Sequence, residues 1–101
     1  MIFRIIVRPE AQTDLSESYR WYEGKRDGLG ADFLLQIEVG LEFLRRYPES
    51  HPFEYRETRK HLIKRFPYKI IYLITGDTLV VLAVIHVKRS AKVLRQRLEP
   101  E

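Results

Sequence analysis

The chain has 101 residues, enough for one domain with its own hydrophobic core. It has no cysteine, which excludes disulfide frameworks and thiolate metal sites, and no apolar run approaches the ~18 residues of a membrane span. The net charge of +4 is unevenly distributed: residues 56–97 hold eleven Lys or Arg and two acidic residues, whereas residues 1–55 hold seven and ten. We expect a soluble cytoplasmic domain whose C-terminal half either binds an acidic partner, nucleic acid or protein, or is a solvated basic face.

The chain opens with a short apolar run, residues 2–7, that is rich in β-branched side chains and ends at Arg8. Proline suits the first position of a helix, so Pro9 predicts that a strand ends here and a helix begins. The apolar spacing that follows is helical and predicts a helix from Pro9 to about Arg26.

Residues 27–30 (DGLG) break this helix, and a second apolar stripe predicts another from about Ala31 to Arg46, ended by Pro48. Two helices joined by a short glycine loop pack as an antiparallel hairpin. We expect Gly40 to let the two helices approach closely. The aromatic residues expected where the helices meet each other or the sheet are Trp21, Tyr22 and Phe43.

The most apolar part of the chain lies between Arg65 and Arg89. Two β-prone runs, Tyr68–Ile74 and Leu79–His86, are joined by a glycine-containing turn, which predicts an antiparallel hairpin at the centre of a sheet. Both alternating faces of each run are apolar, so the sheet is covered on both sides or keeps one face for a partner. Strict alternation would place Val81, Ala83 and Ile85 on one face.

The segments flanking this hairpin complete the fold. Residues 47–57 hold two prolines and indicate a loop, and residues 58–64 predict a short charged strand at the sheet edge. Ser90 is a candidate N-cap for a short helix, residues 91–98, whose apolar side chains would cover one sheet face. The predicted order is β-αα-βββ-(α), an α+β fold with a helical hairpin on a small, mainly antiparallel sheet whose first strand can pair with its last.

No cofactor or metal motif is present: there is no phosphate loop or HExxH, and the three histidines are scattered. What remains is a group of basic residues around the hairpin: Arg59, His61, Lys64, Arg65, Lys69, His86, Lys88 and Arg89. Adjacent strands could bring Lys69 and the His86 end together on one rim. Such a rim could cleave RNA, with cations stabilising the pentavalent phosphate, or it could dock a macromolecule without chemistry.

Simpler roles compete with these functional ones. A histidine at a strand end most often makes a local hydrogen bond, so acid–base work by His86 is the rarer reading. Packing across strands is favoured over base stacking for Tyr68 and Tyr72. One helical hairpin and a two-turn tail leave part of a doubly apolar sheet bare, and bare apolar surface on a small domain marks a protein-binding site.

Five stretches, in this order and spacing, resemble the RelE/ParE superfamily of type II toxin–antitoxin toxins, also called plasmid stabilisation proteins. They are PEAQTDLSESYRWYE, GLGADFLLQIEVGLEFL, YPES, RFPYKIIYLI and LVVLAVIHVKR. The resemblance covers nearly the whole chain, as one domain over residues 1–101. It implies a bacterial toxin that arrests growth and is neutralised by a cognate antitoxin wrapped over its apolar and basic surface. It also implies that operator DNA is bound only through the toxin–antitoxin complex.

The superfamily divides by target. RelE-like members are ribosome-dependent mRNA endoribonucleases, and Lys69 and Arg89 match two of their catalytic positions. The position of their tail tyrosine corresponds to about Leu94, whose side chain cannot transfer a proton. His86 could take over the role of that tyrosine. The motifs RFPYKIIY, WYE and IH-x-x-R look more ParE-like, which implies inhibition of DNA gyrase by binding, without a catalytic residue or cofactor. A degenerate member that only binds its antitoxin is a third possibility.

The resemblance and the charge distribution together define the expected contact residues. Catalysis is not expected; in the ribonuclease alternative it would fall to Lys69, His86 and Arg89. Contact with the antitoxin, and with gyrase or alternatively the ribosome and mRNA, is expected from Arg59, His61, Lys64, Arg65, Lys88, Arg89, Arg95 and Arg97.

Overall fold

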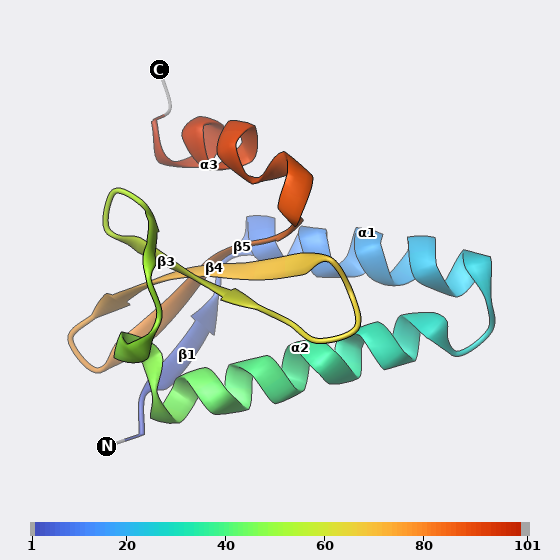
Figure 1. The fold of residues 1–101 in the computed structure, drawn as a ribbon, viewed down its shortest axis with the longest axis horizontal. Coiled ribbons are helices and arrows are strands. Elements are labelled where there is room, and N and C mark those ends of the chain that lie inside the picture. Colours follow the sequence, from blue (N-terminus) through green and yellow to red (C-terminus); the bar gives the residue numbers. More distant parts are fainter. Residues whose placement is uncertain (1, 100–101) are drawn as a thin grey trace.

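A computed structural model describes residues 2–99 (Figure 1). Five strands form one sheet in the order β1-β5-β4-β3-β2, in which β1 is parallel to β5 and the other pairs are antiparallel. The elements are β1 Arg4–Val7, α1 Pro9–Lys25, α2 Leu29–Arg46, the 3-10 turn Pro48–Ser50, β2 Phe53–Tyr55, β3 Thr58–Leu62, β4 Tyr68–Thr75, β5 Thr78–His86, the 3-10 turn Val87–Arg89 and α3 Ser90–Leu98. The α+β fold, the order of the predicted elements and the pairing of first with last strand are therefore confirmed, and β2 is an additional strand.

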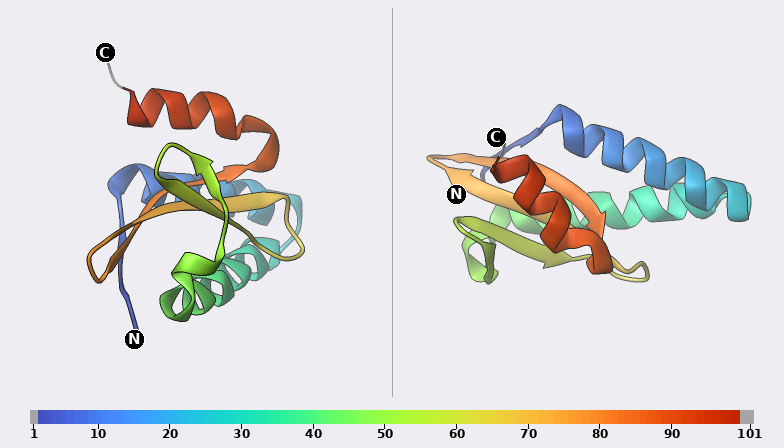
Figure 2. Two further views of the ribbon diagram at one scale, coloured as in Figure 1. Left: turned by 60° about the vertical axis from the view of Figure 1, so that its left-hand side comes forward. Right: turned by 90° about the horizontal axis from the view of Figure 1, so that it is seen from above.

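The sheet separates two hydrophobic clusters. On one face the antiparallel helices α1 and α2 cover a large core that includes Phe33, Ile70 and Tyr72. On the other face α3 covers a smaller core formed by Ile71, Ala83, Ile85 and Leu94 (Figure 2). The prediction that the tail helix covers one sheet face is confirmed; the helix begins at Ser90, with Arg89 at the N-cap position. No helix within residues 2–99 is long and apolar enough to cross a membrane.

The segment expected to be a loop contains a strand, and the expected edge strand is internal. β2 has only three residues and pairs with β3 in an irregular register, so β2 and not β3 is the edge. Three residues are too few to produce a recognisable alternation. Between the two strands Arg56 adopts a left-handed φ of 54°, and the hydroxyl of Thr58 closes the turn by donating to the Tyr55 carbonyl at 2.6 Å.

A β-bulge inverts the faces of the last strand. Ile71 pairs with Ala83, but Tyr72 pairs with Val81, so Leu82 is an extra residue in β5. Val81 consequently faces α1 and α2, whereas Ala83 and Ile85 face α3. The expectation that these three residues share one face is wrong, because an inserted residue shifts the alternation by one position.

One of the three aromatic residues expected where the helices meet each other or the sheet is on the surface: Trp21 is 58% exposed. Phe43 is 44% exposed but meets the sheet, because its ring stacks on His61 of β3 with centroids 5.8 Å apart. Tyr22 does lie at the contact and packs against the rings of Phe33 and Phe66, with centroids 5.3 and 4.9 Å away. Consecutive residues point about 100° apart on a helix, so Trp21 and Tyr22 cannot both enter the same core.

The close approach of the helices occurs at Gly30 and not at Gly40. A Cβ on Gly40 would lie 3.1 Å from the His61 ring and 3.2 Å from Ile70, so this glycine sets the distance between α2 and the sheet. A Cβ on Gly30 would lie 2.7 Å from the backbone oxygen of Tyr19 in α1. The amide of Gly30 also donates to the Glu23 carboxylate at 2.9 Å.

The Gly30→Ala substitution is expected to lower the free energy of unfolding by about 1–3 kcal/mol, because the methyl group would clash with rigid backbone. The matched control is Gly24→Ala in α1, where a Cβ meets no heavy atom within 4 Å and should be neutral or slightly stabilising. Urea denaturation of the two variants measures the difference. Equal stabilities would contradict the tight contact between α1 and α2.

Candidate functional site

Two connections that carry exposed cations meet at one end of the sheet. The β3–β4 connection carries Lys64 and Arg65, and the turn after β5 carries Lys88 and Arg89. The amide of Val87 donates to the Pro67 carbonyl at 2.9 Å and holds the two connections together. The outward face of α3 extends this surface, and in Figure 2 the start of α3 lies beside the β3–β4 connection. We call the resulting surface the cationic end: Lys64, Arg65, Lys88, Arg89, Lys92 and Arg95.

Most of these charges are not neutralised within the described part of the chain. Arg65 lies 3.6 Å from Asp32, and both side chains are well exposed, so this ion pair is weak. Ion pairs of the other five cations to residues 2–99 are absent. Lys92 was not among the residues singled out from the sequence, but its three-residue spacing from Arg95 in the predicted tail helix would have placed it on the same face.

A groove of about 750 Å³ opens beside the cationic end, between α1 and the connection from β5 to α3. Trp21 and Glu17 line it on the α1 side, and His86, Arg89 and Val93 line it on the other. The Trp21 ring is exposed and has the Lys25 ammonium 4.6 Å from its centroid. The groove thus combines apolar and aromatic side chains with polar and charged ones of both signs, which suits an extended or helical protein segment.

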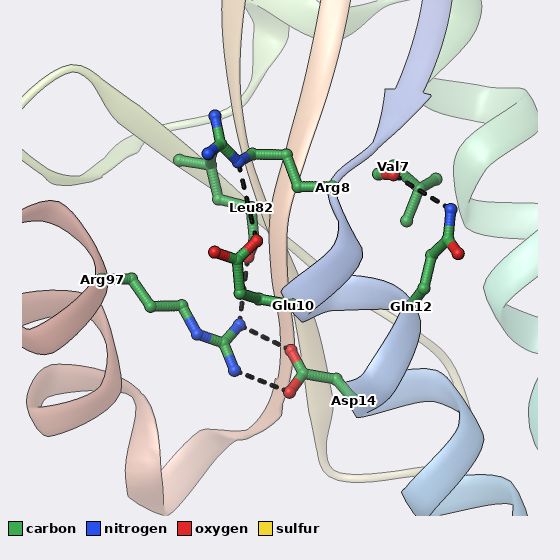
Figure 3. A network of polar contacts seen from close by, with 7 residues as sticks. All are labelled: Val7, Arg8, Glu10, Gln12, Asp14, Leu82 and Arg97. Atoms are coloured by element: carbon green, nitrogen blue, oxygen red, sulfur yellow. Dashed lines mark hydrogen bonds and ion pairs between the residues drawn. The ribbon is translucent and has the colours of Figure 1, made fainter.

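Arg97 is used inside the fold. Its guanidinium donates to both oxygens of Asp14, at 2.7 and 2.8 Å, and to the carbonyl of Leu82 at 3.0 Å (Figure 3). Hydrogen bonds to Asp14 raise the pKa of Arg97. The same carboxylate accepts the amide of Val84, so it connects α1, the bulge of β5 and α3.

Arg59 and His61 are also held within the structure, away from the cationic end. The Arg59 guanidinium donates to the carbonyls of Glu49 and His51 and lies over the ring of Phe53 at 4.2 Å. The ring of His61 is hydrogen-bonded to His51, with 2.8 Å between Nδ1 and Nε2. Burial and the neighbouring His51 lower the pKa of His61 to about 4, so this side chain is neutral at physiological pH.

Lys69 does not join the cationic end either. It is 6% exposed and donates to Glu54 at 2.7 Å, and Lys60 contacts the other oxygen of Glu54 at 3.1 Å. Burial alone would raise the pKa of Glu54, but the hydrogen bonds from the two lysines outweigh it and hold this pKa below its usual value. The charge of Lys69 is therefore shared with a carboxylate inside the fold.

The rim of Lys69 and His86 expected for RNA cleavage does not form. His86 pairs with Tyr68, their rings are 5.5 Å apart, and both line the groove beside α1. Lys69 is the next residue along β4 and pairs with Ile85, which belongs to the core under α3. Because successive strand residues point to opposite faces, the sheet separates Lys69 from His86.

The tail position that RelE-like enzymes would fill with a proton donor is part of the core. Leu94 is 1% exposed and packs with Ile71, Ala83 and Ile85. Within residues 2–99 there is also no group of three or more side chains arranged to hold a metal ion.

A family model described as the ParE toxin of the type II toxin–antitoxin system, parDE, matches residues 5–91. The chain belongs to the ParE toxin family. This ParE-family toxin is similar in structure to a chain of the chromosomal ParDE toxin–antitoxin system from P. aeruginosa, with a TM-score of 0.77 and 17% identity over 85% of this chain and 97% of that one. It is also similar to a chain of the RelBE2 toxin–antitoxin complex from Mycobacterium tuberculosis, with a TM-score of 0.58 and 21% identity over 85% and 99%. No curated protein sequence matches it significantly.

The resemblance to the RelE/ParE superfamily, and to its ParE branch, is thereby confirmed. The two structural similarities are at low identity and establish the fold of the ParE-family toxin.

Proposed function

We propose that this ParE-family toxin arrests growth by binding DNA gyrase through the cationic end and the adjacent groove, without chemistry of its own. The observation that carries the proposal is the gathering of six exposed cations beside a groove that offers Trp21 and Val93 for apolar contact. Exposed cations next to apolar contact surface are the composition of a docking surface for an acidic macromolecule. Gyrase is cytoplasmic, so the activity would be too.

The residues of the ribonuclease alternative support this choice by their placement. Lys69 is paired with Glu54 under α3, and His86 lies on the other side of the sheet. In general acid–base catalysis, the group that transfers the proton lies within hydrogen-bond reach of the reacting atoms. The cation that stabilises those atoms must lie beside them as well. Lys69 and His86, on opposite sheet faces, do not meet that requirement, so of the three residues only His86 and Arg89 lie together, in the groove.

An antitoxin is the second proposed partner. Both similar solved structures are described as toxin–antitoxin systems or complexes. A segment with apolar and acidic side chains would fill the groove beside Trp21 and neutralise Arg89, and it would block gyrase by occupying the same surface. In this proposal operator DNA is reached only through the antitoxin complex.

The test is to add the purified toxin to gyrase supercoiling reactions and, separately, to translating ribosomes. Supercoiling should be inhibited in proportion to the toxin added and restored by stoichiometric antitoxin, while mRNA remains intact. Cleaved mRNA together with undisturbed supercoiling would overturn the proposal.

A further inference from the structure

One side of α2 carries a line of apolar residues that remain about half exposed, although Phe43 also stacks on the His61 ring of β3, with centroids 5.8 Å apart. Leu35, Val39 and Phe43 follow at four-residue spacing, which places them on one side of the helix, and Tyr47 continues the line at the C-cap. Their exposed fractions are 53%, 52%, 44% and 56%. In Figure 1, α2 lies at the lower border of the molecule.

The apolar surface extends from α2 across to the sheet. A groove of about 320 Å³ runs between α2 and β3, with Gly40 and His61 among its lining residues. Leu62, on the far side of this groove, is 58% exposed. Contiguous apolar surface of this kind on a small domain marks a site of protein association.

The residues along α2 are arranged symmetrically about Val39. Leu35 and Phe43 lie four residues before and after it, and an acid, Asp32, and a base, Arg46, lie seven residues before and after. Seven residues are close to two turns, so all five positions lie within one outward sector. The apolar positions mirror one another, whereas the charges at the two ends are opposite.

This pattern is complementary to a second copy of itself running in the opposite direction. A two-fold axis through Val39 would set Leu35 of each copy against Phe43 of the other, and Asp32 against Arg46. The charges at both ends are available for this pairing. Within residues 2–99 Arg46 makes no ion pair, and the carboxylate of Asp32 makes an ion pair only with the exposed Arg65, at 3.6 Å.

We propose that the toxin forms a symmetric dimer in which α2 packs antiparallel against α2 of a second copy. The placement of Asp32 and Arg46 at equal distances from Val39 favours a second copy over an unrelated helix. Only a contact between two identical helices related by a two-fold axis requires opposite charges at equal distances from one residue. The interface uses neither Lys88 nor Arg89, nor the groove between α1 and α3. The dimer therefore does not depend on gyrase or an antitoxin as partners.

Disulfide crosslinking tests the axis directly, because the natural chain has no cysteine. In the Val39→Cys variant the axis brings two identical side chains together, within the Cβ separation that a disulfide needs. Mild oxidation should yield covalent dimer at least about tenfold faster than in the control Ser16→Cys, an exposed position on α1. Equal crosslinking rates in the two variants would overturn the proposal.

Charge exchange tests the direction of the helices by sedimentation. Arg46→Glu places like charges at both ends of the contact and should weaken the dimer about tenfold. The double variant Asp32→Lys/Arg46→Glu restores opposite charges and should recover it. A purified toxin that stays monomeric at every concentration, with the apolar line covered only when antitoxin is added, would overturn the dimer and assign this surface to the antitoxin.

Discussion

The Arg97→Ala substitution is expected to lower the free energy of unfolding by about 2–4 kcal/mol, because it leaves a largely buried carboxylate without its counter-charge. The side chain of Asp14 is only 12% exposed and would keep a single backbone donor, the amide of Val84 at 2.9 Å. Breaking a fully buried pair costs about 3–5 kcal/mol, and the 24% exposure of Arg97 places the expected loss somewhat below that. Chemical denaturation measures it.

The loss should be concentrated in α3. Asp14 is the point at which α1, the β5 bulge and α3 are joined, so its release frees α3 before the central strands. Hydrogen exchange of α3 amides should therefore accelerate more than that of β4. The matched control is Arg95→Ala, two residues away and exposed, which should change stability by less than about 0.5 kcal/mol. Similar stabilities for both variants would show that the contact with Asp14 does not hold α3.

The double substitution Lys88→Glu/Arg89→Glu is expected to weaken gyrase inhibition about a hundredfold, which corresponds to ~2.7 kcal/mol. Both side chains are exposed at the centre of the cationic end, and reversing them changes the local charge by four units. Like charges facing an acidic partner slow association and accelerate dissociation. The measurement is the toxin concentration that halves supercoiling.

The control for this variant carries the same change of charge elsewhere. Arg4→Glu/Arg20→Glu alters exposed positions on β1 and α1, outside the cationic end, and should inhibit gyrase nearly as well as the natural toxin. If both double variants lose inhibition equally, net charge and not the cationic end decides binding.

The elements with clear periodicity could be predicted from the sequence. The two long apolar runs of β4 and β5 and the helical stripe of α2 agree with the structure because each buries a continuous face. The excess of basic residues after position 55 correctly indicated a cationic surface, although not which of its members remain exposed.

What could not be predicted depends on contacts between distant segments. β2 is too short to show a pattern, and the extra residue Leu82 in β5 becomes visible only when β4 is placed beside it. Arg97 looked like a free cation, but its partner Asp14 lies 83 residues earlier in the chain. Lys69 was likewise expected on an open rim and is paired with Glu54, in a strand that was predicted as a loop.

The growth of cells producing the His86→Gln variant distinguishes a toxin that acts by binding from one that acts by proton transfer. His86 accepts the amide of Lys88 at 3.1 Å through Nδ1, a hydrogen bond that glutamine can also accept, whereas glutamine does not titrate. We expect this variant to arrest growth as strongly as the natural toxin. A variant that folds and still inhibits gyrase supercoiling normally, but no longer arrests growth, would contradict action by binding alone.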